Sequence, residues 1–196
     1  MFLKMKMDCK MEMEYLLDTN AYFNFLNELS NSIPSERKDE ILGLNTRRFY
    51  ISEITSIEII SVLGKYARGN SGGSQKCNCI IDPNGTICNN QRFTVKRNSW
   101  QKRRIKAWLK MIEETQSGKS ALFNVELISL DRETLEIANK IILYSLSHNF
   151  GSMDAVIAAT AKKKILSGEQ VTVVTSDKAL KACLSKCDIP IFDIYK

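Results

Sequence analysis

Four acidic residues stand where they could hold a metal ion. Asp18 closes a short apolar run near the N-terminus, and Asp177 follows the apolar run 171–175. Both runs are predicted strands, and in an open α/β sheet ligands bind beyond the carboxyl ends of the strands. Asp154 begins a predicted helix, and Glu58 lies one turn into another. If the fold brings these carboxylates together, they form an oxygen-rich site of the kind that Mg²⁺ or Mn²⁺ prefers.

The chemistry of such a site would be hydrolytic. A divalent cation held by carboxylates can activate water and neutralise the charge that develops on a phosphodiester. Without a cation, clustered carboxylates repel one another and their pKa values should rise. The single histidine, His148, excludes catalysis by a pair of histidines and a histidine-rich zinc site. A catalytic site in this chain must therefore rely mainly on carboxylates, thiols or hydroxyls.

Each acidic residue also has a purely structural interpretation. Glu58 follows Thr55 by three positions, which is the spacing of a capping box. Asp154 and Asp177 fall in first helical turns, where acidic side chains interact favourably with the helix dipole. Asp18 is different, because a carboxylate at the end of an apolar strand is costly if it is buried without a partner.

Predicted strands and helices alternate along the chain. The strands cover 15–18, 49–51, 125–130, 171–175 and 189–194, and the helices cover 21–29, 35–44, 55–68, 99–115, 131–149, 153–164 and 177–185. This alternation predicts a parallel sheet with helices on both faces. The helix 153–164 is apolar almost all round, so we expect it to be buried. Asp131 is placed to cap the helix that follows it.

The positive charge of the chain is concentrated in one segment. The net charge is +6, yet residues 83–112 contain no acidic side chain. The same stretch contains eight basic residues, namely Arg92, Lys96, Arg97, Lys102, Arg103, Arg104, Lys106 and Lys110. Such an asymmetry predicts a polyanionic partner.

Basic and aromatic residues alternate in this segment, which favours a grip on RNA. The candidates that line one face of the predicted helix 99–115 are Lys102, Arg103, Lys106 and Lys110. They would bind phosphates while Trp100 or Trp108 stacks on a base. Alternatively, Trp108 belongs to an apolar stripe with Ile105, Leu109 and Ile112 and is part of the core. The basic face could equally be solvated or dock an acidic protein.

The acidic residues lie in four motifs whose order and spacing resemble those of PIN domains. Leu17-Asp-Thr-Asn20 is similar to the opening strand motif, and 52–58, with Ser, Thr and Glu three residues apart, resembles the second acidic motif. Residues 152–161, where Asp begins a helix of small apolar residues, resemble the third motif, and 173–177 resemble the fourth. The likeness extends from about residue 14 to 195 and is closest to the VapC-type toxins of bacterial toxin–antitoxin pairs.

This resemblance implies a PIN-like fold with three layers, α/β/α, around a central parallel sheet. It implies that Mg²⁺ or Mn²⁺ is bound by Asp18, Glu58, Asp154 and Asp177, with Asn20 and Ser176 supporting the site through hydrogen bonds. Glu53 lies near Glu58 and is an alternative for the second acidic position. The implied activity is that of a divalent-metal-dependent endoribonuclease, with RNA as substrate, an antitoxin protein as partner and a homodimer as a candidate assembly. The alternative function is a non-catalytic PIN-like module that binds RNA or protein.

The chain is predicted to form one domain, 1–196, with an insertion at 69–100. Residues 69–74 are rich in glycine and serine, which predicts a flexible link. Residues 82–85, Asp-Pro-Asn-Gly, fit a type I turn, so we predict a β-hairpin over 79–88. Three of the six cysteines, at 77, 79 and 88, lie here. They could bind zinc with a fourth ligand or form a cross-strand disulfide, but free thiols are the main expectation. No signal peptide or membrane-spanning run is evident, which favours a cytoplasmic protein.

Overall fold

The chain divides into two compact units. The computed structural model describes residues 14–30, 48–76, 91–94 and 96–193. The larger unit comprises Met1–Ile59 and Met111–Lys196, and the smaller unit comprises Ile60–Lys110. The smaller unit therefore contains the predicted insertion 69–100 together with parts of two flanking helices.

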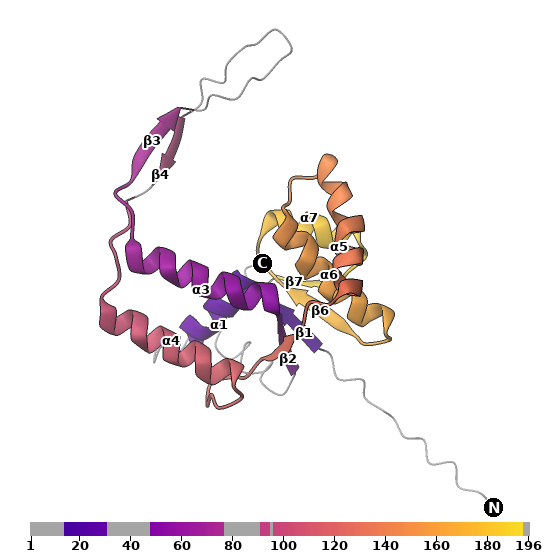
Figure 1. Cartoon of the computed structure of the whole chain (residues 1–196), viewed down its shortest axis with the longest axis horizontal. Coiled ribbons are helices and arrows are strands. Elements are labelled where there is room, and N and C mark those ends of the chain that lie inside the picture. Colours follow the sequence, from indigo (N-terminus) through magenta and orange to yellow (C-terminus); the bar gives the residue numbers. More distant parts are fainter. Residues whose placement is uncertain (1–13, 31–47, 77–90, 95, 194–196) are drawn as a thin grey trace, which may run out of the picture. The chain divides into compact units, whose positions relative to one another are not determined.

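A five-stranded parallel sheet forms the centre of the larger unit (Figure 1). Its strands are β1 (Glu14–Leu17), β2 (Arg48–Ser52), β5 (Glu126–Ile128), β6 (Val171–Val174) and β7 (Ile191–Phe192), and they lie side by side in the order β5-β2-β1-β6-β7. Strand β1 pairs with β6 so that Leu17 lies opposite Val174. The residues that follow these two strands, Asp18 and Thr175, therefore meet at one edge of the sheet.

Helices cover this sheet on both faces. The larger unit contains α1 (Thr19–Ser30), α5 (Arg132–Ile141), α6 (Ser152–Leu166) and α7 (Lys178–Lys186), and α5 continues into the 3₁₀ helix η1 (Ile142–Leu146). Helix α3 (Glu53–Arg68) begins in the larger unit, and helix α4 (Lys102–Gln116) ends there. The predicted three-layer α/β/α arrangement is thus confirmed.

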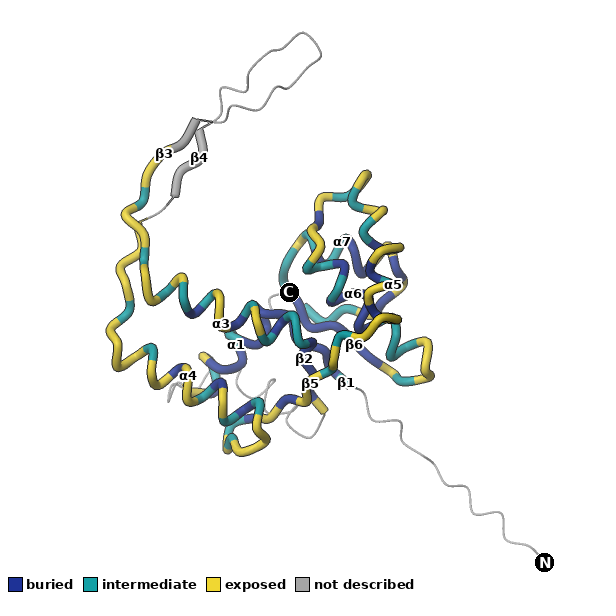
Figure 2. The backbone as a smooth tube through the Cα atoms, in the orientation of Figure 1, coloured by how far each residue is buried: buried dark blue, intermediate teal, exposed yellow. Residues whose placement is uncertain are grey.

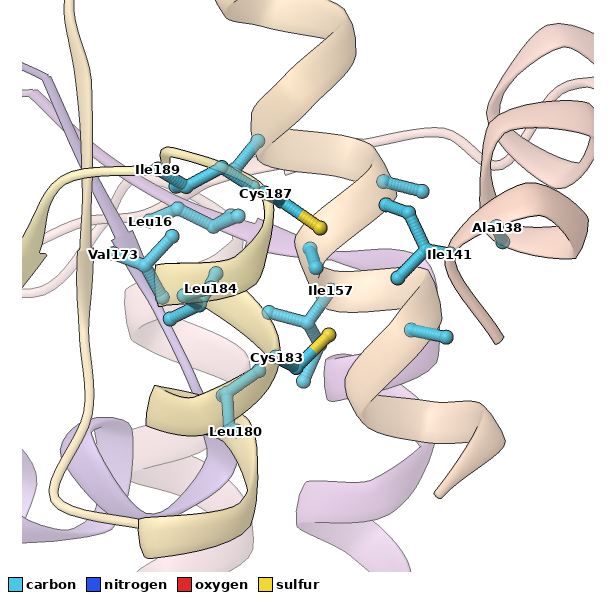
Figure 3. Close-up of a cluster of buried hydrophobic side chains, with 14 of the residues drawn as sticks. Leu16, Ala138, Ile141, Ile157, Val173, Leu180, Cys183, Leu184, Cys187 and Ile189 are labelled. Carbon is cyan, nitrogen blue, oxygen red and sulfur yellow. The ribbon is translucent and has the colours of Figure 1, made fainter. Parts of the chain in front are cut away.

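One face of the sheet packs against α5, α6 and α7 (Figure 3). Leu16 and Val173 point from the strands into this layer and are fully buried. They meet an apolar cluster from the helices that includes Ile157, Leu180, Cys183, Leu184 and Cys187. Both cysteines are buried free thiols. Helix α6 is buried through much of its circumference, as its sequence predicted.

The opposite face of the sheet packs through aromatic rings. Because side chains alternate along a strand, Tyr15 and Phe49 face away from the first cluster. The Phe49 ring lies edge-on to Phe25 of α1, with centroids 5.5 Å apart, and contacts Phe123 at 6.1 Å. Burying both faces explains why β1 and β6 are nearly continuous apolar runs, and Figure 2 shows both strands buried.

The structure confirms the predicted cap of α5 but shows a shorter α-helix than the sequence predicted. Asp131 caps α5 as expected, since its Oδ1 accepts the Thr134 backbone N–H at 2.9 Å. The predicted helix 131–149, however, ends as an α-helix at Ile141. Beyond that point no residue of η1 is fully buried and Leu146 is 89% exposed, so little apolar burial is available to stabilise a longer α-helix.

The smaller unit contains an antiparallel pair, β3 (Gly73–Lys76) and β4 (Gln91–Thr94). Asn70 and Arg97 extend the pairing by an isolated bridge. The hairpin predicted over 79–88, and the helix predicted over 35–44, lie outside the described residues. Within the described ranges, no helix is long and apolar enough to cross a bilayer.

Aromatic stacking organises the helical part of the smaller unit. Trp100 stacks on Tyr66 with centroids 4.4 Å apart and contacts Trp108 at 5.5 Å. Trp108 is only 8% exposed, so the interpretation of this tryptophan as core is confirmed. Leu109, predicted in the same stripe, is 42% exposed, because the buried face of α4 is narrower than the sequence pattern suggested.

A buried hydrogen bond between side chains of α1 and α4 contributes to the stability of the larger unit. The Tyr22 hydroxyl hydrogen-bonds Thr115, whose own hydroxyl donates to the Ile112 carbonyl. We expect Tyr22→Phe to lower the free energy of unfolding by about 1 kcal/mol, because it removes one buried hydrogen bond. Urea denaturation measures this change. Tyr144→Phe is the matched control, since Tyr144 is 41% exposed, and an equal loss in both variants would contradict the assignment.

Candidate active site

Asp18 is a buried carboxylate at the junction of β1 and α1. Its side chain is 3% exposed. Its backbone N–H donates to the Val174 carbonyl at 3.2 Å, which ties the end of β1 to β6. Its Oδ1 accepts the Ala21 backbone N–H at 2.6 Å and so caps α1. The sheet register and the helix start together fix the orientation of this side chain.

Thr175 links Asp18 to a second acidic residue. The Thr175 hydroxyl donates to Asp18 Oδ2 at 2.5 Å and accepts the Asp177 backbone N–H at 3.0 Å. Asp177 in turn caps α7, because its Oδ1 accepts the backbone N–H groups of Ala179 and Leu180 at 2.7 and 3.0 Å. One threonine therefore sets the relative position of two acids that lie at the ends of neighbouring strands.

Glu58 is held by the threonine that follows Asp18. Thr19 Oγ1 donates to Glu58 Oε2 at 2.5 Å. The cap of α3 is instead Ser52, whose Oγ accepts the Thr55 backbone N–H at 3.2 Å. The capping-box interpretation of Glu58 is therefore wrong, because the helix begins at Glu53, before the predicted start at residue 55.

Glu53, the alternative acid in this region, has a different partner. Its Oε2 accepts the backbone N–H of Leu130 at 2.8 Å, in the loop after β5. Glu58, in contrast, interacts electrostatically with Asp18 and Asp154. The two side chains therefore differ in their surroundings: Glu53 is bound to the loop after β5, whereas Glu58 contributes negative charge at Asp18 and Asp154.

Asp154 lies in the first turn of α6. Its Oδ2 accepts the Gly151 backbone N–H at 2.8 Å, so it stabilises the start of the helix. Its pKa is raised, chiefly by burial and further by the negative charges of Asp177 and Glu58. The capping role and membership of the acidic cluster therefore coexist in the same side chain.

Burial has the largest influence on the pKa values of Asp18 and Asp154. The pKa of Asp18 rises to about 6, mainly because burial disfavours its ionised form. Hydrogen bonds from Thr175 and Ala21 oppose this rise, whereas the charges of Asp177 and Glu58 add to it. A cation placed among these carboxylates would relieve both their desolvation and their mutual repulsion.

The cluster is more open than a formed metal centre. In the part of the chain that the structure describes, no three His, Cys, Asp or Glu side chains stand close enough together to hold a metal ion as they are placed. The donor set nevertheless suits a hard divalent cation, because it consists of carboxylates from four separate elements.

An open pocket of about 750 Å³ adjoins the cluster at Asp177. Asn20 and Ser176, the two predicted supporting residues, both line it. The Ser176 hydroxyl donates to Asp193 at 2.8 Å rather than to one of the four acids. The hydroxyls that do orient the acids, Thr19 and Thr175, were missed by the sequence analysis, although Thr19 directly follows the acid that closes one predicted strand and Thr175 ends another.

The candidate RNA-binding residues lie on α4 in the smaller unit. Lys102, Arg103, Lys106 and Lys110 are all exposed. The Arg104 guanidinium lies over the Trp100 ring, 3.8 Å from its centroid. Since Tyr66 covers this tryptophan too, Trp100 is occupied by protein partners and is poorly placed to stack on a base.

Comparison with known proteins identifies the family. The sequence pattern that defines the PIN domain matches residues 15–183, which include all four acids. The chain therefore belongs to the PIN-domain family, and the resemblance inferred from the sequence is confirmed. No protein of curated function matches the chain by sequence.

Two solved structures share the fold. FitAcB from Neisseria gonorrhoeae is 19% identical, with a TM-score of 0.54, and the match covers 92% of this chain and 98% of that one. VapBC2 from Rickettsia felis, solved with a DNA fragment from its promoter, is 15% identical with a TM-score of 0.53, and the match again covers 92% and 98% of the two chains. At these identities the likeness supports the fold alone.

The raised pKa of Asp18 predicts a specific dependence of stability on pH. A carboxyl whose pKa is higher in the folded than in the unfolded protein stabilises the fold at low pH, and this contribution is lost as the pH rises through the folded value. In EDTA, we expect the parent to lose roughly 2–3 kcal/mol relative to Asp18→Asn between pH 4 and pH 7. Urea denaturation at each pH measures the difference, and parallel stability curves would contradict it.

Proposed function

We propose that this chain is a divalent-metal-dependent endoribonuclease. Two observations support the proposal: the PIN-family match includes Asp18, Glu58, Asp154 and Asp177, and burial, with a smaller contribution from like charges among these acids, raises the pKa of Asp18 and Asp154. A structural role alone accounts for the backbone caps made by Asp154 and Asp177. Asp18 also caps α1, but a cap alone does not explain why this carboxylate is buried at an energetic cost, where other acids add to the rise of its pKa.

The residues of the cluster fit Mg²⁺ or Mn²⁺. Asp18 and Asp154 would hold the principal cation, and Asp177 and Glu58 would complete the cluster or orient the attacking water. A bound cation supplies Lewis acidity that activates water and neutralises phosphate charge. Thr175 and Thr19 are positioning residues, because their hydroxyls hold Asp18 and Glu58.

The basic face of α4 is the proposed contact with the RNA backbone. Its lysine and arginine side chains are exposed, and helical spacing places Lys102, Lys106 and Lys110 in one row about 6 Å apart along the axis. Because Trp100 is covered by Tyr66 and Arg104, we expect binding through phosphates, without base stacking by this residue. Such binding is electrostatic and weakens with salt.

We further propose that the chain is the toxin of a toxin–antitoxin pair. The likeness of its four motifs to VapC-type toxins supports this role, and the fold shared with VapBC2 is consistent with it. An antitoxin protein would then be its partner. A homodimer stays a prediction that follows from the family.

Cleavage of a mixed structured-RNA pool tests the nuclease. We expect cutting with Mg²⁺ or Mn²⁺ and none in EDTA. Asp18→Asn and Glu58→Gln should each lower the rate by roughly a hundredfold or more, as removal of a group that stabilises charge in the transition state does in other enzymes. Gel electrophoresis of end-labelled RNA measures the rates.

Glu53→Gln is the matched control for Glu58→Gln. Its amide oxygen can still accept the Leu130 N–H, so cleavage should stay within a few-fold of the parent. Equal cleavage by Asp18→Asn and the parent would contradict the proposed site. If Glu53→Gln loses cleavage activity and Glu58→Gln retains it, Glu53 is the second acidic residue of the site.

A non-catalytic RNA-binding module is the second candidate, and the exposed basic face of α4 favours it. Under either function, Arg103→Glu and Lys106→Glu should weaken RNA binding and flatten its salt dependence, by about 0.7 in the slope of log K against log salt for each lost phosphate contact. Fluorescence anisotropy at several salt concentrations measures this slope.

Lys140→Glu, an exposed charge reversal on α5, is the control and should leave the slope nearly unchanged. Binding that does not depend on salt would contradict a role for the basic face. RNA binding by the parent without cutting, in the presence of either metal, would favour the binding module over the nuclease.

A further inference from the structure

The pocket beside Asp177 has a lining that suits a nucleobase. Its volume is about 750 Å³, and it is lined by amide side chains from separate elements. Asn20 and Asn24 project from α1, where a spacing of four residues puts them on one helix face. Asn149 comes from the loop before α6. The pocket therefore presents amide donors and acceptors from two directions.

These three amides have no partners among the described residues. Asn20 and Asn149 are exposed, and Asn24 is half-buried. Within the described ranges, none of the three side chains forms a hydrogen bond, although other asparagines, such as Asn70 and Asn124, do. An amide carries two N–H donors and an acceptor oxygen, so this pocket offers unused hydrogen-bonding capacity for a ligand.

The pocket and the acidic cluster share a residue. Asp177 lines the pocket, and its negative charge contributes to the raised pKa of Asp18 and of Asp154. A group bound in the pocket therefore lies directly beside the place where a phosphate would be cut. In an RNA strand the group next to a scissile phosphate is a nucleobase on its ribose.

We propose, on the basis of the nuclease function proposed above, that this pocket binds the base that flanks the scissile phosphate. Asn20, Asn24 and Asn149 are its specificity-determining residues, and adenine is its preferred base. A carboxamide pairs with adenine through two parallel hydrogen bonds, to N6 and N7. Guanine is most often recognised by arginine, and none of the described residues that line the pocket is an arginine.

The remaining lining is consistent with this ligand. Ala179 and Ala182 of α7 provide small apolar surface that a flat base can cover, and Lys178 supplies a positive charge for a neighbouring phosphate. Single-stranded RNA offers its bases in this way, because unstacked bases can be splayed out and read at their edges. The pocket thus adds base selection to an acidic cluster that has no means of distinguishing sequences.

Binding measured without catalysis tests the pocket independently of cleavage. Fluorescence anisotropy in EDTA would compare short uridine oligonucleotides that carry A, G, C or U at one central position. The parent should bind the adenine oligonucleotide more tightly by roughly fivefold to a hundredfold, the range of one bidentate amide–base pair. Asn24→Ala and Asn149→Ala should each reduce this preference.

The cleavage arm uses the same variants on a randomised single-stranded RNA. Sequencing of the cut ends should show an adenine preference next to the cleaved bond for the parent. Asn24→Ala and Asn149→Ala should flatten the preference while still cutting. Asn27→Ala is the matched control, since Asn27 is exposed on α1 and does not line the pocket.

The outcomes separate this proposal from the nuclease itself. An adenine preference in binding that both asparagine variants reduce supports the pocket even if the parent does not cut RNA, in which case the nuclease proposal alone fails. Cutting by the parent without any base preference overturns the pocket. A preference that survives in both Asn24→Ala and Asn149→Ala overturns it as well.

Discussion

The parallel pairing of β1 with β6 is the constraint on which the candidate site depends. It places Leu17 opposite Val174, so the next residues, Asp18 and Thr175, must meet at the sheet edge. Burial leaves the Asp18 carboxylate little access to water, and the Thr175 hydroxyl provides one of its few hydrogen bonds. The same hydroxyl accepts the Asp177 N–H. One register therefore determines the spacing between two acids that are far apart in sequence.

Hydrogen bonds to the first turns of helices fix the positions of three of the acidic side chains. Asp18, Asp154 and Asp177 each accept backbone N–H groups at the first turn of a helix, which satisfies donors that the helix itself cannot. Each cap occupies one carboxylate oxygen of Asp154 and Asp177. For Asp154 and Asp177 the functional and structural interpretations are therefore compatible, because the cap holds the carboxylate rigidly through one oxygen. The second oxygen of Asp18 accepts the Thr175 hydroxyl.

In the proposed function, the basic segment and the amide pocket would make two different kinds of contact with RNA. Exposed lysine and arginine side chains on α4 suit phosphates, which all RNA shares, whereas amides suit base edges, which differ. Within the smaller unit, Tyr66 and Arg104 pack on the ring of Trp100. Trp100 and Trp108 therefore stabilise the basic helix α4 by packing within the smaller unit.

The sequence by itself determined the alternation of strands and helices, the four acidic motifs and the buried helix α6, because apolar periodicity and residues at element ends are local signals. Only the tertiary structure decided which hydroxyl holds which acid. The Thr19–Glu58 and Thr175–Asp18 bonds join residues 39 and 157 positions apart, and no local pattern encodes such pairs. The tertiary structure also showed that Glu53 accepts a hydrogen bond from the backbone of Leu130. Strand register and packing, which depend on the whole sheet, bring these side chains together.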